Sequence, residues 1–435
     1  MAALATLNRV NPSAGKIAVA YSGGRDSTAL LHATAVQAVQ AGLQVLALHI
    51  HHGLSVHADE WLAHCEAQCA ALAASGFPVS LEFRRLSGAP RAAESVEAWA
   101  RAGRHAALHE MCAAAGIDLL LLAQHRRDQA ETLLLQALRG AGVAGLAGMP
   151  AQQWREGVCW ARPWLTQTRE AIEAYVALHR LKFVEDDSNS DPRFARNRLR
   201  MQVWPALNGA FGHAEAGLAL AAGWAQQALA LQQEMAAADL AVLSNETGLD
   251  MPALRELSIA RASNALRAWV HAQGGQAAPA SLIERLLTEP GSSWPCASGS
   301  LHLYRGRLQW RAASLAPIGP SQSVNLGSPG LYPQPAWGGQ WQVEMTHGLG
   351  VSARLLTSLQ QRQRSGGEQF QRGARTVPRS LKKAWQEAGV PAWEREGPLL
   401  FHGEQLVFVP GLGLDARVLA SSGESRLSLT WTRNP

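Results

Sequence analysis

The chain has 435 residues, 47% of them hydrophobic, and a formal net charge of +5. This length exceeds what one hydrophobic core usually serves, so we expect roughly two or three domains, and the positive charge suits a nucleic-acid partner. A signal-peptide core, an apolar run of membrane-spanning length and a Cys-x-x-Cys pair are all missing from the sequence, which argues against a secreted, membrane-spanning or zinc-ribbon protein and predicts a cytoplasmic one.

The first predicted strand, Ile17–Ala20, runs into the loop Ser22-Gly-Gly-Arg-Asp-Ser27, and a helical pattern over Ser27–Ala41 follows at once. The two glycines let backbone N–H groups close around phosphate oxygens, and the helix N-terminus adds its positive dipole end. The two serines supply hydroxyl donors. Asp26 is unusual beside an anion, which predicts that it acts through Mg²⁺. The loop lacks the Gly-Lys-Ser/Thr ending of a Walker A motif, and this disfavours a kinase or GTPase.

Strand and helix patterns then alternate to about residue 185, which predicts an α/β domain with a doubly wound parallel sheet covered on both faces. Such sheets bind ligands at the carboxyl ends of their strands, where the polar motifs of this sequence fall. The other predicted strands are Gln44–Ile50, Val79–Arg84 and Ile117–Ala123, and the other predicted helices are Ala58–Ser75, Ser95–Ala115 and Gln129–Leu138.

A second polar motif follows the last of these strands, where His125 leads into Arg126-Arg-Asp-Gln-Ala-Glu-Thr132. Asp128 and Glu131 are three residues apart at the start of a helix, so their side chains project from one face. Acidic residues also suit a helix N-terminus, and a purely structural role is therefore the alternative. Beside the Ser22–Ser27 loop, the carboxylate pair predicts a site for Mg²⁺ or for a cationic amine.

The composition changes after residue 200, and it predicts four regions along the chain. These are a nucleotide-binding catalytic domain over 1–200, a mainly helical domain over 201–315, a linker rich in Gly, Pro and Ser over 316–340, and a small α+β domain over 341–435.

The last region carries a basic run between Gln361 and Lys383, with Glu368 as its single acidic residue. Because Phe370 and Trp385 lie in or beside it, the run predicts a nucleic-acid-binding surface, with a solvated charged surface as the alternative. Its basic residues are Arg362, Arg364, Arg372, Arg375, Arg379, Lys382 and Lys383.

The Ser-Gly-Gly-x-Asp-Ser loop after an N-terminal strand resembles the signature of the PP-loop ATP pyrophosphatases, which cleave ATP between its α and β phosphates. The segment around Asp128 resembles the His-x-x-Asp-Asp-Gln-x-Glu-Thr region of the tRNA(Ile)-lysidine synthetases, which modify the wobble cytidine of a CAU-anticodon isoleucine tRNA. The resemblance spans nearly the whole chain. Its further motifs are His51-His-Gly-Leu54, Ser95–Arg104, Arg162-Pro-Trp-Leu165, Asp187-Ser-Asn189, Arg196-Asn-Arg-Leu-Arg200, Leu381–Arg395 and Pro410-Gly-Leu-Gly-Leu414.

The resemblance implies that the C2 oxygen of the cytosine attacks the α-phosphate of ATP, and that the ε-amine of free L-lysine then displaces AMP. It implies Asp26, Asp128 and Glu131 as catalytic residues and Asp26 as the Mg²⁺ ligand. ATP would bind at Ser22, Gly23, Gly24, Arg25, Asp26, Ser27 and His51. The lysine would bind at Asp128 and Glu131 through its ammonium group, and the candidates for its carboxylate are Arg101, Arg104, Arg196 and Arg200.

Two positions depart from the family pattern: Arg127 replaces the first Asp of Asp-Asp-Gln, and Ser55 replaces an Arg. Arg127 removes one carboxylate near the nucleotide, yet Asp128 and Glu131 are kept, so we expect activity to survive. Three alternatives stay open: a tRNA thiolase, which generally needs catalytic cysteines in a motif; a catalytically inactive tRNA-binding protein; and an amidating ligase for a small metabolite. The oligomeric state also stays open, and a homodimer is compatible with the sequence.

Overall fold

The computed structural model describes residues 15–53, 55–88, 96–185, 191–296, 299–312, 319–420 and 425–433. The chain divides into two compact units, Met1–Glu234 and Met235–Pro435. Leu54, Ser95 and the Asp187–Asn189 motif lie outside the described residues. In the part of the chain that is described, no helix combines the length and the apolar character needed to cross a membrane.

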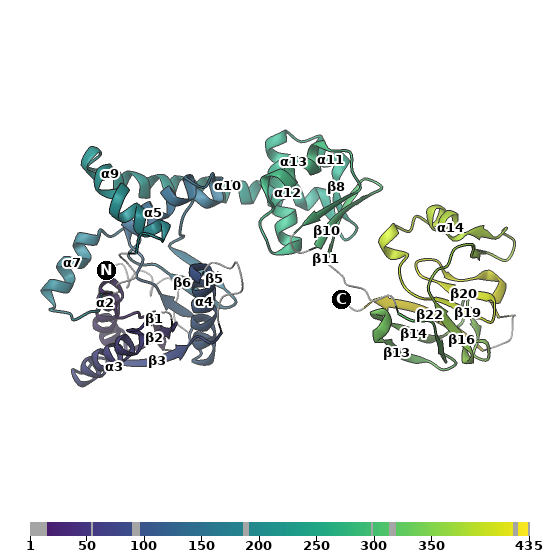
Figure 1. Ribbon diagram of the computed structural model, residues 1–435, viewed down its shortest axis with the longest axis horizontal. Coiled ribbons are helices and arrows are strands. Elements are labelled where there is room, and N and C mark those ends of the chain that lie inside the picture. The colour runs from purple at the N-terminus through teal and green to yellow at the C-terminus, as the bar shows by residue number, and fades with distance from the viewer. Residues whose placement is uncertain are drawn as a thin grey trace. The chain divides into compact units, whose positions relative to one another are not determined.

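The described part of the first unit is built around a six-stranded sheet in the order β3-β2-β1-β4-β6-β5 (Figure 1). All neighbouring strands are parallel except β5 and β6, which form an antiparallel pair at one edge. The strands are β1 (Lys16–Ala20), β2 (Gln44–His51), β3 (Val79–Arg85), β4 (Leu119–Leu121), β5 (Gln152–Arg155) and β6 (Val158–Ala161). The predicted doubly wound sheet is confirmed, with an antiparallel edge strand added.

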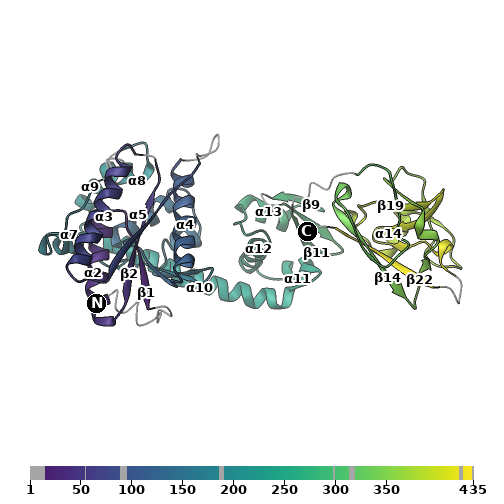
Figure 2. The same ribbon diagram turned by 90° about the horizontal axis from the view of Figure 1, so that it is seen from below.

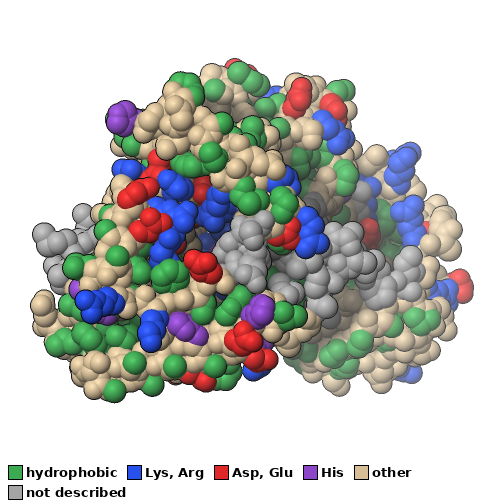
Figure 3. Space-filling model, turned by 60° about the vertical axis from the view of Figure 1, so that its left-hand side comes forward, with side chains coloured by type: hydrophobic (Ala, Val, Ile, Leu, Met, Phe, Trp, Pro, Cys, Tyr) green, Lys and Arg blue, Asp and Glu red, His purple; other side chains and the backbone are tan. Residues whose placement is uncertain are grey.

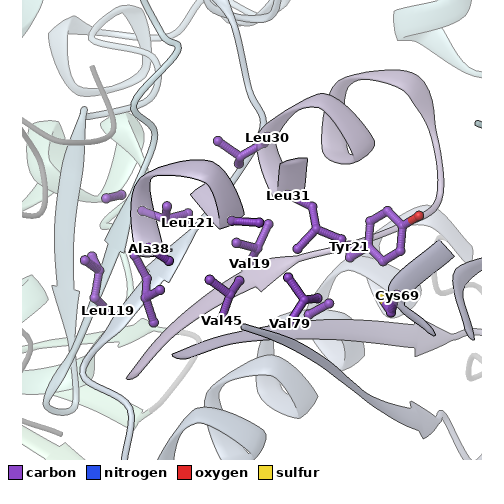
Figure 4. Close-up of a cluster of buried hydrophobic side chains, with 14 of the residues drawn as sticks. Val19, Tyr21, Leu30, Leu31, Ala38, Val45, Cys69, Val79, Leu119 and Leu121 are labelled. Carbon is purple, nitrogen blue, oxygen red and sulfur yellow. The ribbon is translucent and has the colours of Figure 1, made fainter. Parts of the chain in front are cut away.

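Helices cover both faces of this sheet (Figure 2). On one face, Leu30 and Ala38 of α2 and Cys69 of α3 pack against Val19 and Leu121 of the strands (Figure 4). On the other face, α4 packs against buried side chains of β1, β2, β4 and β6. The helical elements of this unit are α2 (Arg25–Ala41), α3 (Ala58–Ala74), α4 (Val96–Ala114), α5 (Arg126–Ala137), α6 (Val143–Leu146), α7 (Arg169–Leu178), α8 (Ala195–Arg198), the π-helical turn η2 (Leu199–Val203), α9 (Trp204–Ala210) and α10 (Ala214–Leu243), whose last residues belong to the second unit.

Helix α5 begins at Arg126, three residues before the predicted start. The reason is local, because the Asp128 carboxylate accepts a hydrogen bond from the His125 backbone N–H at 3.0 Å. This contact fixes His125 as the residue before the helix and places Asp128 in its first turn. The segment Arg126–Thr132 is therefore helical from Arg126 onward.

The first part of the second unit contains three helices and a five-stranded sheet in the order β7-β8-β11-β10-β9, as far as the described residues show. Helices α11 to α13 share their buried core with this sheet. The elements are β7 (Ser244–Asn245), β8 (Gly248–Asp250), α11 (Met251–Arg255), α12 (Ile259–Gly274), α13 (Ala280–Thr288), β9 (Ser293–Cys296), β10 (Gly299–Tyr304) and β11 (Arg307–Ala312).

The second part of this unit is rich in short strands, which form sheets in the orders β12-β16-β19-β20-β21, β13-β14-β22-β15 and β17-β18 within the described ranges. Helix α14 covers a separate apolar cluster beside them. The elements are β12 (Gln322–Val324), β13 (Gly330–Gln334), η3 (Pro335–Trp337), β14 (Gly339–Thr346), β15 (Val351–Ser352), η4 (Leu355–Thr357), β16 (Leu359–Arg362), β17 (Gln369–Phe370), β18 (Arg379–Ser380), α14 (Leu381–Ala388), η5 (Ala392–Glu394), β19 (Leu399–His402), β20 (Gln405–Val409), β21 (Gly413–Leu414), η6 (Ala416–Val418) and β22 (Arg426–Arg433).

The stretch 316–340, predicted as a linker, instead contributes strands to these sheets. Strand β12 pairs with β16, and β13 pairs with β14. Of the Gly, Pro and Ser residues that suggested a linker, Gly327, Ser328 and Pro329 lie between β12 and β13, whereas Ser323, Gly330 and Pro333 lie within the two strands. Residues 316–318 lie outside the described part of the chain.

Candidate active site

The Ser22–Ser27 loop connects β1 to α2 and is held by its own hydroxyl groups. The Ser27 hydroxyl donates to the Gly24 carbonyl at 2.9 Å and accepts from the Ser22 N–H at 3.2 Å. The Ser22 hydroxyl lies 3.0 Å from that of Ser27 and accepts from the Gly24 N–H at 3.3 Å. Gly24 precedes α2 and gives it no side-chain cap. The positive end of the helix therefore faces the loop, as an anion site requires.

Gly23 shows why the loop needs glycine. Its φ is +82°, and a Cβ at this position would lie 2.9 Å from Cys65 Sγ and 3.2 Å from Val184 Cγ2. The Gly23 carbonyl also accepts from the Val184 N–H at 3.0 Å. The loop is thus pressed between α3 and the strand-like bridge at Val184, which leaves its backbone preorganised.

The two carboxylates of α5 are clamped by two arginines from α8 and η2. Arg196 donates from Nε to Glu131 at 2.8 Å and from Nη2 to Asp128 at 3.0 Å. Arg200 makes the same pair of contacts, at 2.7 Å to Glu131 and 2.9 Å to Asp128. Burial alone would lower the pKa of Arg200, but these partners and Asp26 raise it above its ordinary value. We call Asp128, Glu131, Arg196 and Arg200 the four-residue cluster.

The four members differ in exposure, and this separates their possible roles. Glu131 is completely buried, whereas the Asp128 side chain is 13% exposed and the two arginine side chains are about a third exposed. Glu131 therefore lies behind the cluster as its anchor. Asp128 is the carboxylate of this pair that a substrate can approach.

His125 connects this cluster to the loop, and sequence reasoning did not select it. Its Nε2 lies 3.7 Å from an oxygen of Asp26 and 3.4 Å from an oxygen of Asp128. The ring is buried, and its Nδ1 has no hydrogen-bond partner among the described residues. Its place shortly after the buried strand β4 and three residues before Asp128 is a signal from which it could have been found. Asp26, Asp128 and Glu131, the predicted catalytic residues, are thus brought into one site.

Among the described residues of this site, Asp26 is the carboxylate without a short ion pair. Asp128 and Glu131 pair with the two guanidinium groups of the four-residue cluster, whereas Arg25, 3.5 Å from Asp26, is held by Glu173 at 2.6 Å. Basic and acidic side chains lie side by side on this unit in Figure 3. The Asp26 side chain is 34% exposed, and its closest described charged partners are 3.5 and 3.7 Å away. Asp26 fits a Mg²⁺ that takes its other ligands from nucleotide phosphates and water.

Arg127 turns away from the four-residue cluster toward other helices. It donates to Glu215 of α10 at 3.0 Å and to Glu170 of α7 at 3.4 Å, and its guanidinium lies 5.4 Å from the ring centre of Trp204. Arg127 therefore contacts Glu215 and Glu170, and the effect of the missing carboxylate on the nucleotide site stays a prediction. The charge of Arg127 ties α5 to α7, α9 and α10.

Two further residues predicted to bind ATP are engaged by protein groups. Arg25 donates to Glu173 of α7 at 2.6 Å. The Nε2 of His51 lies 3.2 Å from Asp59 and 3.0 Å from Arg85. Both residues lie at the carboxyl edge of the sheet, and their role toward the nucleotide stays a prediction.

Arg101 and Arg104 lie exposed on α4, whereas Asp128 and Glu131 lie on α5 and contact Arg196 and Arg200. Arg101 and Arg104 belong instead with His105, whose pKa is lowered to about 4 by burial and by surrounding arginines, Arg101 foremost. Arg196 and Arg200 thus contact the carboxylates of α5 directly, and the roles of Arg101 and Arg104 toward the lysine carboxylate stay predictions.

The basic run of the second unit is largely exposed, but its aromatic residues are not. Phe370 is 2% and Trp385 is 1% exposed, and both belong to the core beneath α14. The expectation that they help to bind RNA is therefore wrong. Arg362 is half-buried over Phe401, whereas the exposed members are Arg364, Arg372, Arg375, Arg379, Lys382 and Lys383.

Three family models match the chain: a PP-loop domain over residues 3–207, a TilS substrate-binding domain over 249–309 and a TilS substrate C-terminal domain over 359–431. The tRNA(Ile)-lysidine synthase of Ralstonia nicotianae is 41% identical over 93% of this chain and 90% of its own length. The tRNA(Ile)-lysidine synthase of Alkalilimnicola ehrlichii is 38% identical over 95% and 93%. Among solved structures, the U34-tRNA thiolase NcsA from Methanococcus maripaludis is 12% identical, with a TM-score of 0.40, over 49% of this chain and 72% of that one.

Proposed function

The chain belongs to the tRNA(Ile)-lysidine synthase family, and we propose that its first unit joins free L-lysine to C2 of the wobble cytidine of CAU-anticodon tRNA(Ile). The products would be lysidine, AMP and pyrophosphate. The observation that supports this most is the joining of the phosphate loop to Asp128 and Glu131 through His125. An ATP site and a cation site then lie side by side, as a reaction between an adenylated base and an amine requires.

The first step is adenylation, in which the C2 oxygen of the cytosine attacks the α-phosphate and pyrophosphate leaves. The N–H groups of the Ser22–Ser27 loop and the N-terminus of α2 stabilise the negative charge that develops on the leaving group. Because the loop is preorganised by Gly23 and by the Ser22–Ser27 contact, it needs little rearrangement to do so. Asp26 would hold Mg²⁺, which neutralises phosphate charge when bound.

The second step is attack of the lysine ε-amine on the activated C2, with AMP as the leaving group. Lysine arrives as an ammonium ion and has to lose a proton before it reacts. Asp128, which is partly exposed and lies with Asp26 around His125 Nε2, binds the ammonium group and accepts the proton. Glu131 holds Arg196 and Arg200 in place, and these two arginines remain the candidates for the lysine carboxylate.

The chemistry of the cysteines supports lysine rather than sulfur transfer. Burial raises the pKa of Cys65, Cys69 and Cys112 to about 12, so these thiols are protonated at neutral pH. All five cysteines are free thiols, and Cys296 alone of them is not fully buried. A thiolase would need a reactive thiolate beside the nucleotide.

The exposed basic residues of the second unit would bind the body of the tRNA, and a homodimer remains compatible with this arrangement. The two chemical steps are separated by measuring tRNA-dependent pyrophosphate release with and without lysine. We expect Asp26→Asn to abolish release in both conditions. Asp128→Asn should keep adenylation and raise the KM for lysine at least tenfold. Equal loss of adenylation in both variants would contradict the division of roles.

A further inference from the structure

Arg162 is a buried cation without a described counter-charge. It directly follows β6, is 6% exposed and donates from Nη1 to the Pro150 carbonyl at 2.9 Å. Its Nε is buried without a hydrogen-bond partner, and none of the carboxylates that the structure describes lies within ion-pair distance. Burial, together with Arg155 and Arg101, lowers its pKa to about 10. An unpaired buried guanidinium is costly and calls for an anion.

Other basic groups surround Arg162. The Arg155 guanidinium lies 4.9 Å from the ring centre of the buried Trp160, and its Nη1 is 3.3 Å from His105 Nδ1. The His105 ring packs edge-on against Trp160 at 5.1 Å. His105 feels the charges of Arg101, Arg155, Arg104 and Arg162. We call Arg101, Arg104, His105, Arg155 and Arg162 the α4-face cluster.

Arg162 of the α4-face cluster lies at the edge of the sheet that holds the reaction site, whereas Arg155 starts opposite Val158 at the other end of β6 and extends its guanidinium over Trp160. Strands β4 and β6 are parallel and adjacent, with Leu121 opposite Ala161. The residue after β6 is therefore beside the chain segment that leads from β4 to His125. Trp160 belongs to the apolar cluster covered by α4, which puts these cations on the opposite face of the sheet from α2.

We propose that the α4-face cluster binds a backbone phosphate of the tRNA anticodon loop beside the wobble cytidine. This inference rests on the proposed function, because the target base has to enter the same edge of the sheet. A lysine carboxylate fits less well, since it carries an α-ammonium group next to it. The positive charges of Arg101, Arg155 and Arg162 would repel that ammonium group. A phosphodiester carries only negative charge and suits guanidinium donors.

The experiment measures the affinity of the full chain for a CAU-anticodon tRNA(Ile) transcript over a series of salt concentrations. Each lost phosphate contact to a single-stranded loop lowers the slope of log K against log salt by about 0.7, which corresponds to a roughly fivefold weaker affinity at 0.1 M salt. We expect this effect for Arg155→Gln and Arg162→Gln, with the affinity for ATP and the KM for lysine unchanged. Arg101→Gln, at an exposed position, tests the same contact without a folding risk.

The control is Arg84→Gln, an arginine of the edge strand β3 that already pairs with Glu110. It should leave the salt slope unchanged. If the cluster variants match this control, the phosphate site is refuted. If they raise the KM for lysine without weakening tRNA binding, the cluster holds the lysine carboxylate and the proposal is also overturned. If the wild-type chain transfers no lysine but the variants still lose slope, the proposed function fails while the phosphate site stands.

Discussion

Replacing Glu131 by Gln tests whether this residue anchors the active site or contacts the substrate. The variant keeps the shape of the side chain but removes the negative charge that both Arg196 and Arg200 contact, at 2.8 and 2.7 Å. Breaking a fully buried pair costs about 3–5 kcal/mol. Since both arginines keep Asp128 as a partner and are about a third exposed, solvent screening reduces this cost. We expect the first unit to lose roughly 2–3 kcal/mol of unfolding free energy.

For a unit of this size, such a loss lowers the melting temperature by roughly 4–12 °C. Calorimetry on the full chain measures it through the transition of the first unit. The matched control is Glu170→Gln, whose 67% exposed side chain makes a single described ion pair, at 3.4 Å to Arg127. That variant should stay within about 0.5 kcal/mol of the wild type.

One combined result would refute the anchor role of Glu131. If Glu131→Gln melts together with the control and raises the KM for lysine as strongly as Asp128→Asn, then Glu131 meets the substrate directly. A large drop in stability with a smaller effect on the KM supports the anchor role.

Further predictions concern the loop, the family departure and acid stability. Gly23→Ala should weaken ATP binding at least tenfold in a calorimetric titration, because the φ of Gly23 is +82° and an added Cβ would lie 2.9 Å from Cys65 Sγ. Adding Cys65→Ala should restore only part of the lost affinity. Full restoration would show that the backbone angle does not limit binding. Arg127→Asp restores the family residue but places a carboxylate against Glu215. This variant should therefore melt at a lower temperature than Arg127→Gln, with the KM for ATP unchanged. A melting temperature above that of Arg127→Gln would contradict this. The lowered pKa of His105, about 4, means that the unfolded chain binds more protons between pH 6.5 and 4, so stability is full above pH 6.5 and falls as the pH drops through this window. His105→Asn should flatten that fall in urea melts at successive pH values, and an unchanged pH profile would refute the assignment.

The sequence predicted the first unit well because its signals are local. The strand before Ser22 and the helix after Ser27 are adjacent in the chain, and the alternation of strands and helices leaves few topologies for a parallel sheet. The carboxylate pair of α5 was also visible, since helical spacing brings Asp128 and Glu131 to one face.

The family resemblance placed Arg196 and Arg200 at the lysine site, but their direct pairing with these two carboxylates was not predicted. Arg196 and Arg200 lie 65 to 72 residues from the carboxylates that they contact, and no periodicity connects them. The strands within 316–340 were missed for the same reason, because β12 pairs with β16 across a long stretch of chain. By contrast, the burial of Trp385 was readable, since it shares an apolar stripe with Leu381 and Ala384 at helical spacing.

Transfer of lysine to the wobble cytidine by this chain can be tested directly. The measurement is incorporation of radiolabelled lysine, in the presence of ATP and Mg²⁺, into a CAU-anticodon tRNA(Ile) transcript and into a matched transcript whose wobble cytidine is uridine. We expect label on the first transcript, with release of AMP, and none on the second. Label on both, or tRNA-dependent pyrophosphate release without any lysine transfer, would contradict it.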